Sequence, residues 1–128
     1  MLLPILTLLS GCVSIIHFNH STTNIVKTET PNCVEEGLAS YYSDEFEGKV
    51  TASGEIFTQS GLTAAHRSLP FGTIVKVTNL ENGKSVLVKI NDRGPFLLNR
   101  IIDLSKTASQ KLGFFSKGLA KVRIEVVK

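Results

Sequence analysis

The chain has 128 residues, of which 42% are hydrophobic and 20% charged; it is long enough for one domain and has the composition of a globular protein. Residues 37–128 hold 13 Lys and Arg against 8 Asp and Glu, and this moderately basic balance fits either an anionic polymer partner or an ordinary soluble surface. The chain shows no run rich in Lys and Arg and no aromatic RNA-binding motif, so nucleic acid is not expected as a partner.

The first segment, residues 1–11 (MLLPILTLLSG), is apolar and precedes Cys12. A membrane-spanning helix needs about 20 apolar residues, so this shorter run predicts a signal peptide. Small residues directly before a cysteine are typical of bacterial lipoprotein signals, in which cleavage exposes the cysteine and the thiol is acylated. We therefore expect Cys12 to carry the lipid (diacylglycerol, with palmitate) that anchors the mature protein to a membrane. Val13, rather than Asp, follows, which favours the periplasmic face of the outer membrane.

Residues 12–36 are rich in Ser, Thr and Asn and show no sustained periodicity, which predicts a flexible linker. His17, His20 and Cys33 are interpreted as linker residues, because nothing near them completes a metal site or a catalytic setting.

From residue 37 to the C-terminus the pattern predicts a mostly β domain. Strands are expected at 37–42, 62–66, 73–80, 84–92, 100–104 and 120–127. Asn82-Gly83, between two alternating apolar runs, predicts a hairpin turn. One short helix is expected within 105–113, capped by Ser105 and ended by Gly113. Several short strands with one small helix favour a compact barrel.

Five stretches of this domain, GLASYYSDEFEGKVTASGEIF, LTAAHRSLPFGTIVKVTN, NGKSV, INDRGPF and RIIDLS, occur in this order. Together they resemble the rare lipoprotein A (RlpA-like) family, and the resemblance covers nearly all of residues 37–127. It implies a six-stranded double-psi β-barrel with one or two short helices over residues 37–128. It also implies a bacterial cell-envelope lipoprotein. No cofactor is expected.

The resemblance leaves two function classes open. Several family members are lytic transglycosylases, which are carbon–oxygen lyases that cleave the MurNAc–GlcNAc bond of peptidoglycan and form 1,6-anhydroMurNAc. Related expansin-like barrels can instead bind wall polymers without catalysis. Either class would have peptidoglycan glycan strands as its partner, and cell-division proteins are further candidate partners.

Two aspartates are candidate catalytic groups. Asp103 follows the apolar pair Ile101-Ile102, where burial could raise a carboxyl pKa enough for proton donation at neutral pH. The alternative is a structural acid just before a helix. Asp92 has the same strand parity as Val86, Val88 and Ile90, so it is expected to point along their apolar face or to stabilise the turn that follows.

Glu55 and His66 complete the candidate set. Glu55 falls at a motif position of the family, although an isolated Glu is commonly a solvated surface residue. His66 ends an apolar strand and is either a structural residue or one that orients a carboxylate. We expect Asp103 to be the acid/base, with Asp92 and Glu55 shaping the field and holding the glycan. The spacing of these groups fits no standard zinc or calcium pattern.

Four further residues are candidates for substrate binding. Arg93 and Arg100 border the two aspartates and could bind a sugar substituent or pair with the aspartates. Tyr41 and Tyr42 could form a stacking platform for sugar rings or fill the core. Phe71 and Phe96, which lie beside turn residues, are interpreted as core.

Overall fold

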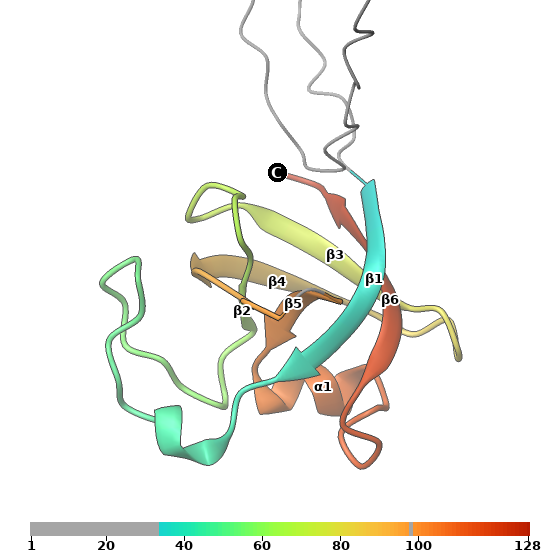
Figure 1. Ribbon diagram of the computed structural model, residues 1–128, viewed down its shortest axis with the longest axis horizontal. Helices are drawn as coiled ribbons and strands as arrows, with labels where there is room; N and C mark the ends of the chain where they lie inside the picture. The colour runs from blue at the N-terminus through green and yellow to red at the C-terminus, as the bar shows by residue number, and fades with distance from the viewer. Residues whose placement is uncertain (1–33, 98) are drawn as a thin grey trace, which may run out of the picture.

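The computed structural model describes residues 34–97 and 99–128 (Figure 1). The predicted signal peptide, the expected lipidation site Cys12, and linker residues His17, His20 and Cys33 lie outside the described residues. In the described part of the chain, no helix has the length and apolar character needed to cross a membrane.

The secondary structure follows the predicted order. Its elements are β1 (Val34–Tyr41), the 3-10 helix η1 (Asp44–Phe46), β2 (Thr63–Ala65), β3 (Ile74–Asn79), β4 (Ser85–Asp92), β5 (Arg100–Leu104), α1 (Lys106–Lys111) and β6 (Ala120–Val126). The family resemblance allowed for a second short helix, but the position of η1 was not predicted. Strand β1 begins at Val34 rather than at residue 37, because Val34 pairs with Glu125 and the next residues continue that ladder along β6.

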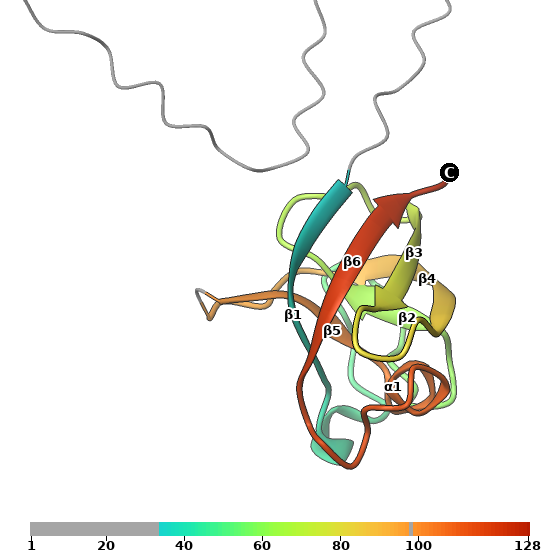
Figure 2. The ribbon, with the colours of Figure 1, turned by 90° about the vertical axis from the view of Figure 1, so that its right-hand side faces the viewer.

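The six strands close into a barrel in the order β1-β5-β2-β4-β3-β6. The pairs β1–β5 and β2–β4 are parallel, and the other four pairs are antiparallel. In both ribbon views β1 and β6 run side by side as a long curved pair, and α1 lies beside one end of the barrel (Figures 1 and 2). The predicted mostly β, six-stranded barrel is therefore confirmed.

The barrel interior is filled by aliphatic side chains that alternate along the strands. The fully enclosed ones include Val75, Val77, Val88, Ile90, Ile102, Leu104 and Val122. The turn that follows α1 contributes Leu112 and Phe114, which are also buried. This alternation is the period-two pattern from which the strands were predicted.

Two local signals have the predicted structural roles. Gly83 adopts a positive φ of 76° in the turn that joins β3 to β4, and its amide donates to the carbonyl of Asn79. Ser105 caps α1 by accepting a hydrogen bond from the amide of Ala108 at 3.2 Å. The same Asn79 is buried and donates its side-chain amide to the carbonyl of Leu112, which ties the hairpin to the end of the helix.

Candidate active site

Four residues on four adjacent strands lie in register across one face of the barrel wall: Ser40 on β1, Asp103 on β5, Ala65 on β2 and Asp92 on β4. We call this set the carboxylate row. The neighbouring pairs Ala64–Leu104 and Ala64–Ile90 consist of residues that are fully buried in the barrel core. Successive residues of a strand point to opposite faces, so the carboxylate row lies on the outer face of the wall.

A register shift places Asp92 in this row. Ala64 pairs with Ile90, but Ala65 pairs with Asp92, so Asn91 is skipped between the two pairs. An extra residue of this kind reverses the side on which the following side chain projects. The expectation that Asp92 points the same way as Val88 and Ile90 was therefore wrong.

Both carboxylate oxygens of Asp92 are held by hydrogen-bond donors. The hydroxyl of Tyr42 donates to Oδ2 at 2.5 Å. The backbone amides of Ala52 and Arg93 donate to Oδ1, each at 2.9 Å. These three donors come from three separate segments, so the carboxylate of Asp92 has a fixed orientation and acts as an acceptor.

Only one carboxylate oxygen of Asp103 accepts a hydrogen bond within the described residues. The hydroxyl of Ser40 donates to Oδ1 at 2.6 Å, and Nε of Arg100 lies 3.7 Å from the same oxygen. Within the described residues Oδ2 has no hydrogen-bond partner, and it is not among the buried unpaired atoms. Asp103, whose side chain is 18% exposed, therefore keeps one oxygen available to a bound molecule.

Tyr42 donates its hydroxyl to Asp92 and is also affected by the charge of Asp103. Burial raises the pKa of its phenol far above the usual range, and the hydrogen bond to Asp92 and the charges of Asp92 and Asp103 raise it further. Its ring packs on Phe57, with centroids 4.4 Å apart, and edge-on against Phe46 at 5.6 Å. Tyr42 is therefore a neutral hydrogen-bond donor in a fixed ring position, rather than an open platform for sugar stacking.

Glu55 lies beyond this row, in the turn that also supplies the Ala52 amide. Its carboxylate accepts hydrogen bonds from Nζ of Lys89 at 2.9 Å and from the side-chain amide of Asn91 at 3.5 Å. The Lys89 hydrogen bond is the main cause of a lowered pKa at Glu55. Glu55 is therefore an ionised, largely exposed carboxylate near Asp92, and it is poorly suited to donate a proton.

The ring of His66 makes contacts that differ from those expected. Its Nδ1 accepts hydrogen bonds from the amides of Ser68 and Leu69, both at 3.1 Å, and its Nε2 lies 3.1 Å from a carboxylate oxygen of Glu35. Because Nδ1 is an acceptor, the proton of the neutral ring resides on Nε2 and points at Glu35. Both ring nitrogens are thus occupied away from Asp92 and Glu55, so the direct orientation of these carboxylates by His66 is not found. The described residues contain no group of three side chains arranged as a metal site.

Two other substrate-binding candidates also have different partners. The guanidinium of Arg93 donates to the carbonyls of Leu69 and His66 and does not contact a carboxylate of the row. Tyr41, the last residue of β1, packs against the barrel core and donates its hydroxyl to the carbonyl of Phe115 at 2.7 Å. Arg100 is the one candidate arginine that lies beside a row aspartate.

The interpretation of Phe71 and Phe96 as core residues was wrong. Phe71 is 42% exposed, and Phe96 is 84% exposed. Both lie on loops at the end of the barrel where β2 and β4 finish, so the hydrophobic pattern of the strands does not extend to them.

Sequence reasoning also missed two residues of the site. Ser40 was overlooked although it has the same strand parity as Tyr42, which is the signal that could have revealed it. The backbone amide of Ala52 was overlooked because every residue except proline has such a donor, so the residue type does not identify it. Only the fold shows that this amide donates to Asp92.

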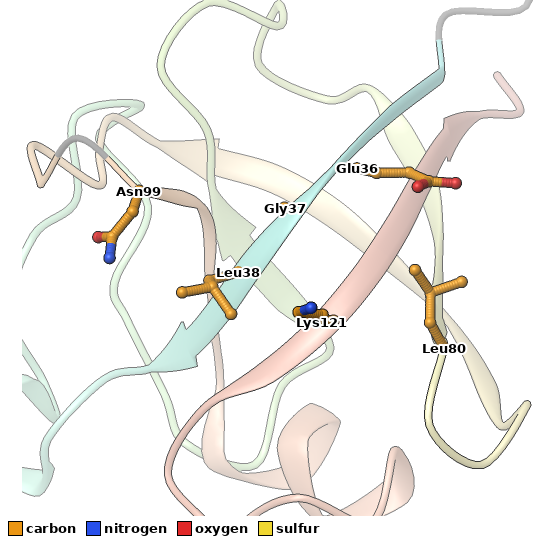
Figure 3. Close-up of a pocket in the computed structure, with 6 residues that line it drawn as sticks. All are labelled: Glu36, Gly37, Leu38, Leu80, Asn99 and Lys121. Carbon is orange, nitrogen blue, oxygen red and sulfur yellow. The ribbon is translucent and has the colours of Figure 1, made fainter.

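A hollow of about 350 Å³ lies on the outer face of β1 and β6. It is lined by Glu36, Gly37, Leu38, Leu80, Asn99 and Lys121 (Figure 3). Glu36 and Leu80 lie at one end in this view and Asn99 lies at the other. None of these residues belongs to the carboxylate row, but Leu38 pairs with Arg100, whose Nε lies 3.7 Å from Asp103.

Comparison with known sequences finds a matching family and several relatives. Residues 34–124 match the family model described as lytic transglycolase. The chain belongs to this family. It is 58% identical over 91 residues to a probable endolytic peptidoglycan transglycosylase RlpA of Treponema pallidum, a match that covers 71% of this chain and 29% of the relative. The predicted membership of the RlpA-like family is confirmed.

Two further relatives carry the same type of name. The endolytic peptidoglycan transglycosylase RlpA of Campylobacter jejuni is 53% identical over 92 residues, covering 72% of this chain and 34% of the relative. The RlpA of Pseudomonas aeruginosa is 53% identical over 89 residues, covering 70% of this chain and 26% of the relative. The chain thus spans about a third or less of the length of these relatives.

Solved structures with the same fold include the Streptomyces papain inhibitor and an expansin of Clavibacter michiganensis. The inhibitor has a TM-score of 0.62 at 25% identity, covering 77% of this chain and 98% of the inhibitor. The expansin has a TM-score of 0.59 at 24% identity, covering 74% of this chain and 50% of the expansin. With the closed six-stranded topology, these likenesses confirm the predicted double-psi β-barrel.

Proposed function

We propose that this chain is an endolytic lytic transglycosylase, which cleaves the MurNAc–GlcNAc bond of peptidoglycan glycan strands. Two findings support the proposal: the family to which the chain belongs, and relatives at 53–58% identity that are named as peptidoglycan transglycosylases. The observation that carries it is the carboxylate row, in which Asp103 keeps a free oxygen beside a fully held Asp92.

The reaction needs one group that first donates and then accepts a proton. The protonated acid gives its proton to the leaving oxygen of the glycosidic bond as the bond from C1 of MurNAc to that oxygen breaks. The same group, now a carboxylate, takes the proton from the C6 hydroxyl of that MurNAc while the oxygen bonds to C1. The product is a 1,6-anhydro ring, and no water enters it.

Asp103 is the better of the two aspartates for this role. Its Oδ2 is free of hydrogen bonds within the described residues, so a proton on that oxygen would displace no existing contact. At Asp92, by contrast, protonation would oppose three donors that already point at the two oxygens. Asp92 is therefore assigned the fixed negative charge that stabilises an oxocarbenium-like transition state.

Such a substrate requires a location in the cell envelope. The apolar segment that ends at Cys12 offers a route there, as a cleaved signal peptide followed by a lipidated cysteine. A membrane anchor at Cys12 would hold the barrel beside the wall through the linker, and fatty-acid labelling that persists in Cys12→Ser would contradict this part of the proposal.

The test is digestion of purified sacculi by the full chain, with mass spectrometry of the released fragments. The wild type should release fragments that end in 1,6-anhydroMurNAc. Asp103→Asn keeps the acceptor oxygen for Ser40 but removes the acid, so release should fall about 10²–10⁴-fold. Glu81→Gln, which also removes one negative charge but lies in the β3–β4 turn beside Lys117, should retain normal release.

Three outcomes would contradict the proposal. Fragments with a reducing-end muramic acid would indicate a hydrolase. Undiminished release by Asp103→Asn would exclude Asp103 as the acid/base. A folded wild type that binds sacculi but releases nothing would support the expansin-like, non-catalytic function instead.

A further inference from the structure

Two loops at the end of the barrel beside the carboxylate row are joined by a pair of arginines. The first loop follows β2, and the second follows Asp92 at the end of β4. Arg67, on the first loop, donates through Nε to the carbonyl of Pro95 at 2.7 Å and through Nη2 to the carbonyl of Arg100 at 2.8 Å. The same Nη2 also contacts the carbonyl of Leu97.

Arg93 makes the reciprocal contacts from the second loop to the first. Its Nη1 donates to the carbonyl of Leu69 at 2.8 Å and to that of His66 at 3.3 Å. Its guanidinium carbon lies 4.0 Å from the ring centroid of Phe71. Each arginine thus satisfies backbone carbonyls of the opposite loop, and together they fix the two loops relative to each other.

This fixed pair of loops presents apolar side chains to solvent. Phe96 is 84% exposed and Leu97 is 57% exposed; we call these two residues the apolar tip. Phe71, stacked under Arg93, is 42% exposed nearby. Adjacent exposed apolar side chains on a backbone held by charged donors are typical of a preorganised binding contact, because little conformational entropy remains to be lost on binding.

The apolar tip is close to the carboxylate row. Phe96 follows Asp92 by four residues, so their Cα atoms are at most about 14 Å apart. The segment carrying the tip connects β4, with Asp92, to β5, with Asp103, and it projects from the barrel wall in Figure 2. A chain molecule bound across the row can therefore reach the tip within a few sugar units.

We propose that the apolar tip is a carbohydrate subsite, in which Phe96 and Leu97 contact the apolar face of a sugar ring of the same glycan that is cleaved at the carboxylate row. This inference rests on the proposed function for the identity of the glycan. A ring face carries only C–H groups, which pack well against an aromatic or aliphatic surface.

The charges around the tip favour a glycan over an anionic membrane as its occupant. Surface attachment to anionic lipid combines apolar side chains with free Lys or Arg head groups. Two of the three arginines near the tip, Arg67 and Arg93, donate to backbone carbonyls. The third, Arg100, has its Nε 3.7 Å from Asp103 Oδ1 and makes no hydrogen bond through that atom within the described residues. The tip therefore offers apolar contact with at most one nearby arginine, and the charge of that arginine faces the Asp103 carboxylate.

The experiment measures binding of the full chain to purified sacculi by co-sedimentation, in the Asp103→Asn background so that turnover does not intervene. Phe96→Ala and Leu97→Ala should each weaken binding, and the double variant should weaken it about tenfold. The matched control is Leu87→Ala, because Leu87 is 53% exposed on β4 but lies five residues before Asp92. It should alter affinity by no more than about twofold.

A double variant that sediments with sacculi like its parent would overturn the proposal. If that variant also lost binding to vesicles of anionic lipid, the tip would be a membrane contact instead. The outcome is separable from that of the proposed function. If wild-type chain releases no fragments yet Phe96→Ala and Leu97→Ala lose binding, the subsite stands and the catalytic proposal fails. If the wild type cleaves and the tip variants bind and cleave normally, the catalytic proposal stands and the subsite proposal fails.

Discussion

The hydrogen bond from Tyr42 to Asp92 offers a direct test of how the carboxylate row is held. Tyr42→Phe deletes only the hydroxyl and keeps the ring that packs on Phe57 and Phe46. Asp92 then loses its sole donor to Oδ2 among the described residues but keeps the amides of Ala52 and Arg93 on Oδ1. The variant therefore separates the hydroxyl from the packing of the ring.

The expected magnitude follows from the charge on the acceptor. A hydrogen bond to a charged group contributes about 1.5–3 kcal/mol, against about 0.5–1.5 kcal/mol for a neutral pair. Tyr42→Phe should therefore lower the free energy of unfolding at pH 7 by about 1.5–3 kcal/mol. Tyr41→Phe, the matched control on the next residue, removes a hydroxyl that donates to a neutral carbonyl and should cost less, about 0.5–1.5 kcal/mol.

Tyr42→Phe should also change how the stability of the protein depends on pH in alkaline solution. Because the pKa of Tyr42 is raised above its usual 10.0, the folded protein keeps the phenol proton at pH values where the unfolded chain loses it. This stabilisation is complete below pH 10 and declines as pH rises above it, by up to about 1.4 kcal/mol per pH unit. The stability gap between wild type and Tyr42→Phe should therefore narrow between pH 10 and pH 11.

Urea unfolding at pH 7, 10 and 11 measures both effects. The reasoning that Tyr42 is a buried neutral donor to a carboxylate would be refuted by two results together. Tyr42→Phe would lower the free energy of unfolding no more than Tyr41→Phe does, and the stability difference between wild type and Tyr42→Phe would stay constant with pH. A lowered rate of fragment release with unchanged affinity for sacculi would further assign the hydroxyl to the positioning of Asp92 rather than to substrate contact.

Two other predictions concern strand β1. In Gly37→Ala the new Cβ would lie 2.6 Å from Cγ2 of Ile101, so the free energy of unfolding should fall by about 1–3 kcal/mol, as measured by urea denaturation; an unchanged midpoint would mean that Ile101 moves aside freely. A chain that begins at residue 37 should melt at a lower temperature than one that begins at Val34, because it lacks three β1–β6 pairs, the Glu36–Arg123 ion pair and the Glu35 partner of His66. Equal melting temperatures in circular dichroism would show that these contacts add nothing.

The strands and the helix were predictable because their signals are local. Alternation of apolar residues fixes which strand residues face the core, as in Val75 and Val77, and Asn82-Gly83 specifies its own turn. The start of β1 was not predictable in this way. Val34 and its two neighbours are polar or exposed, and they join the strand only because β6, more than eighty residues later, provides their pairing partner.

The site could be predicted in part. Asp92 and Asp103 are the two carboxylates that the fold brings to one row, and Arg100 lies next to Asp103 as their spacing indicated. The contacts of Arg93 and His66 could not be foreseen. Their partners are backbone carbonyls, backbone amides and a glutamate at the start of β1, and residue type alone carries no information about which main-chain groups a loop will leave unpaired.

The direction of Asp92 shows why parity arguments fail near a site. A one-residue shift in pairing moves a side chain to the other face of a sheet, and nothing in the letters Ile90-Asn91-Asp92 marks such a shift. The shift lies in the pairing of β2 with β4: Ala64 pairs with Ile90 and Ala65 with Asp92, so Asn91 has no partner in that ladder. Had the strand stayed regular, a carboxylate would have entered the aliphatic core, where an unpaired charge is very costly. The irregularity thus removes that cost and, by the same movement, sets Asp92 across Ala65 from Asp103, which is the geometry on which the proposed chemistry depends.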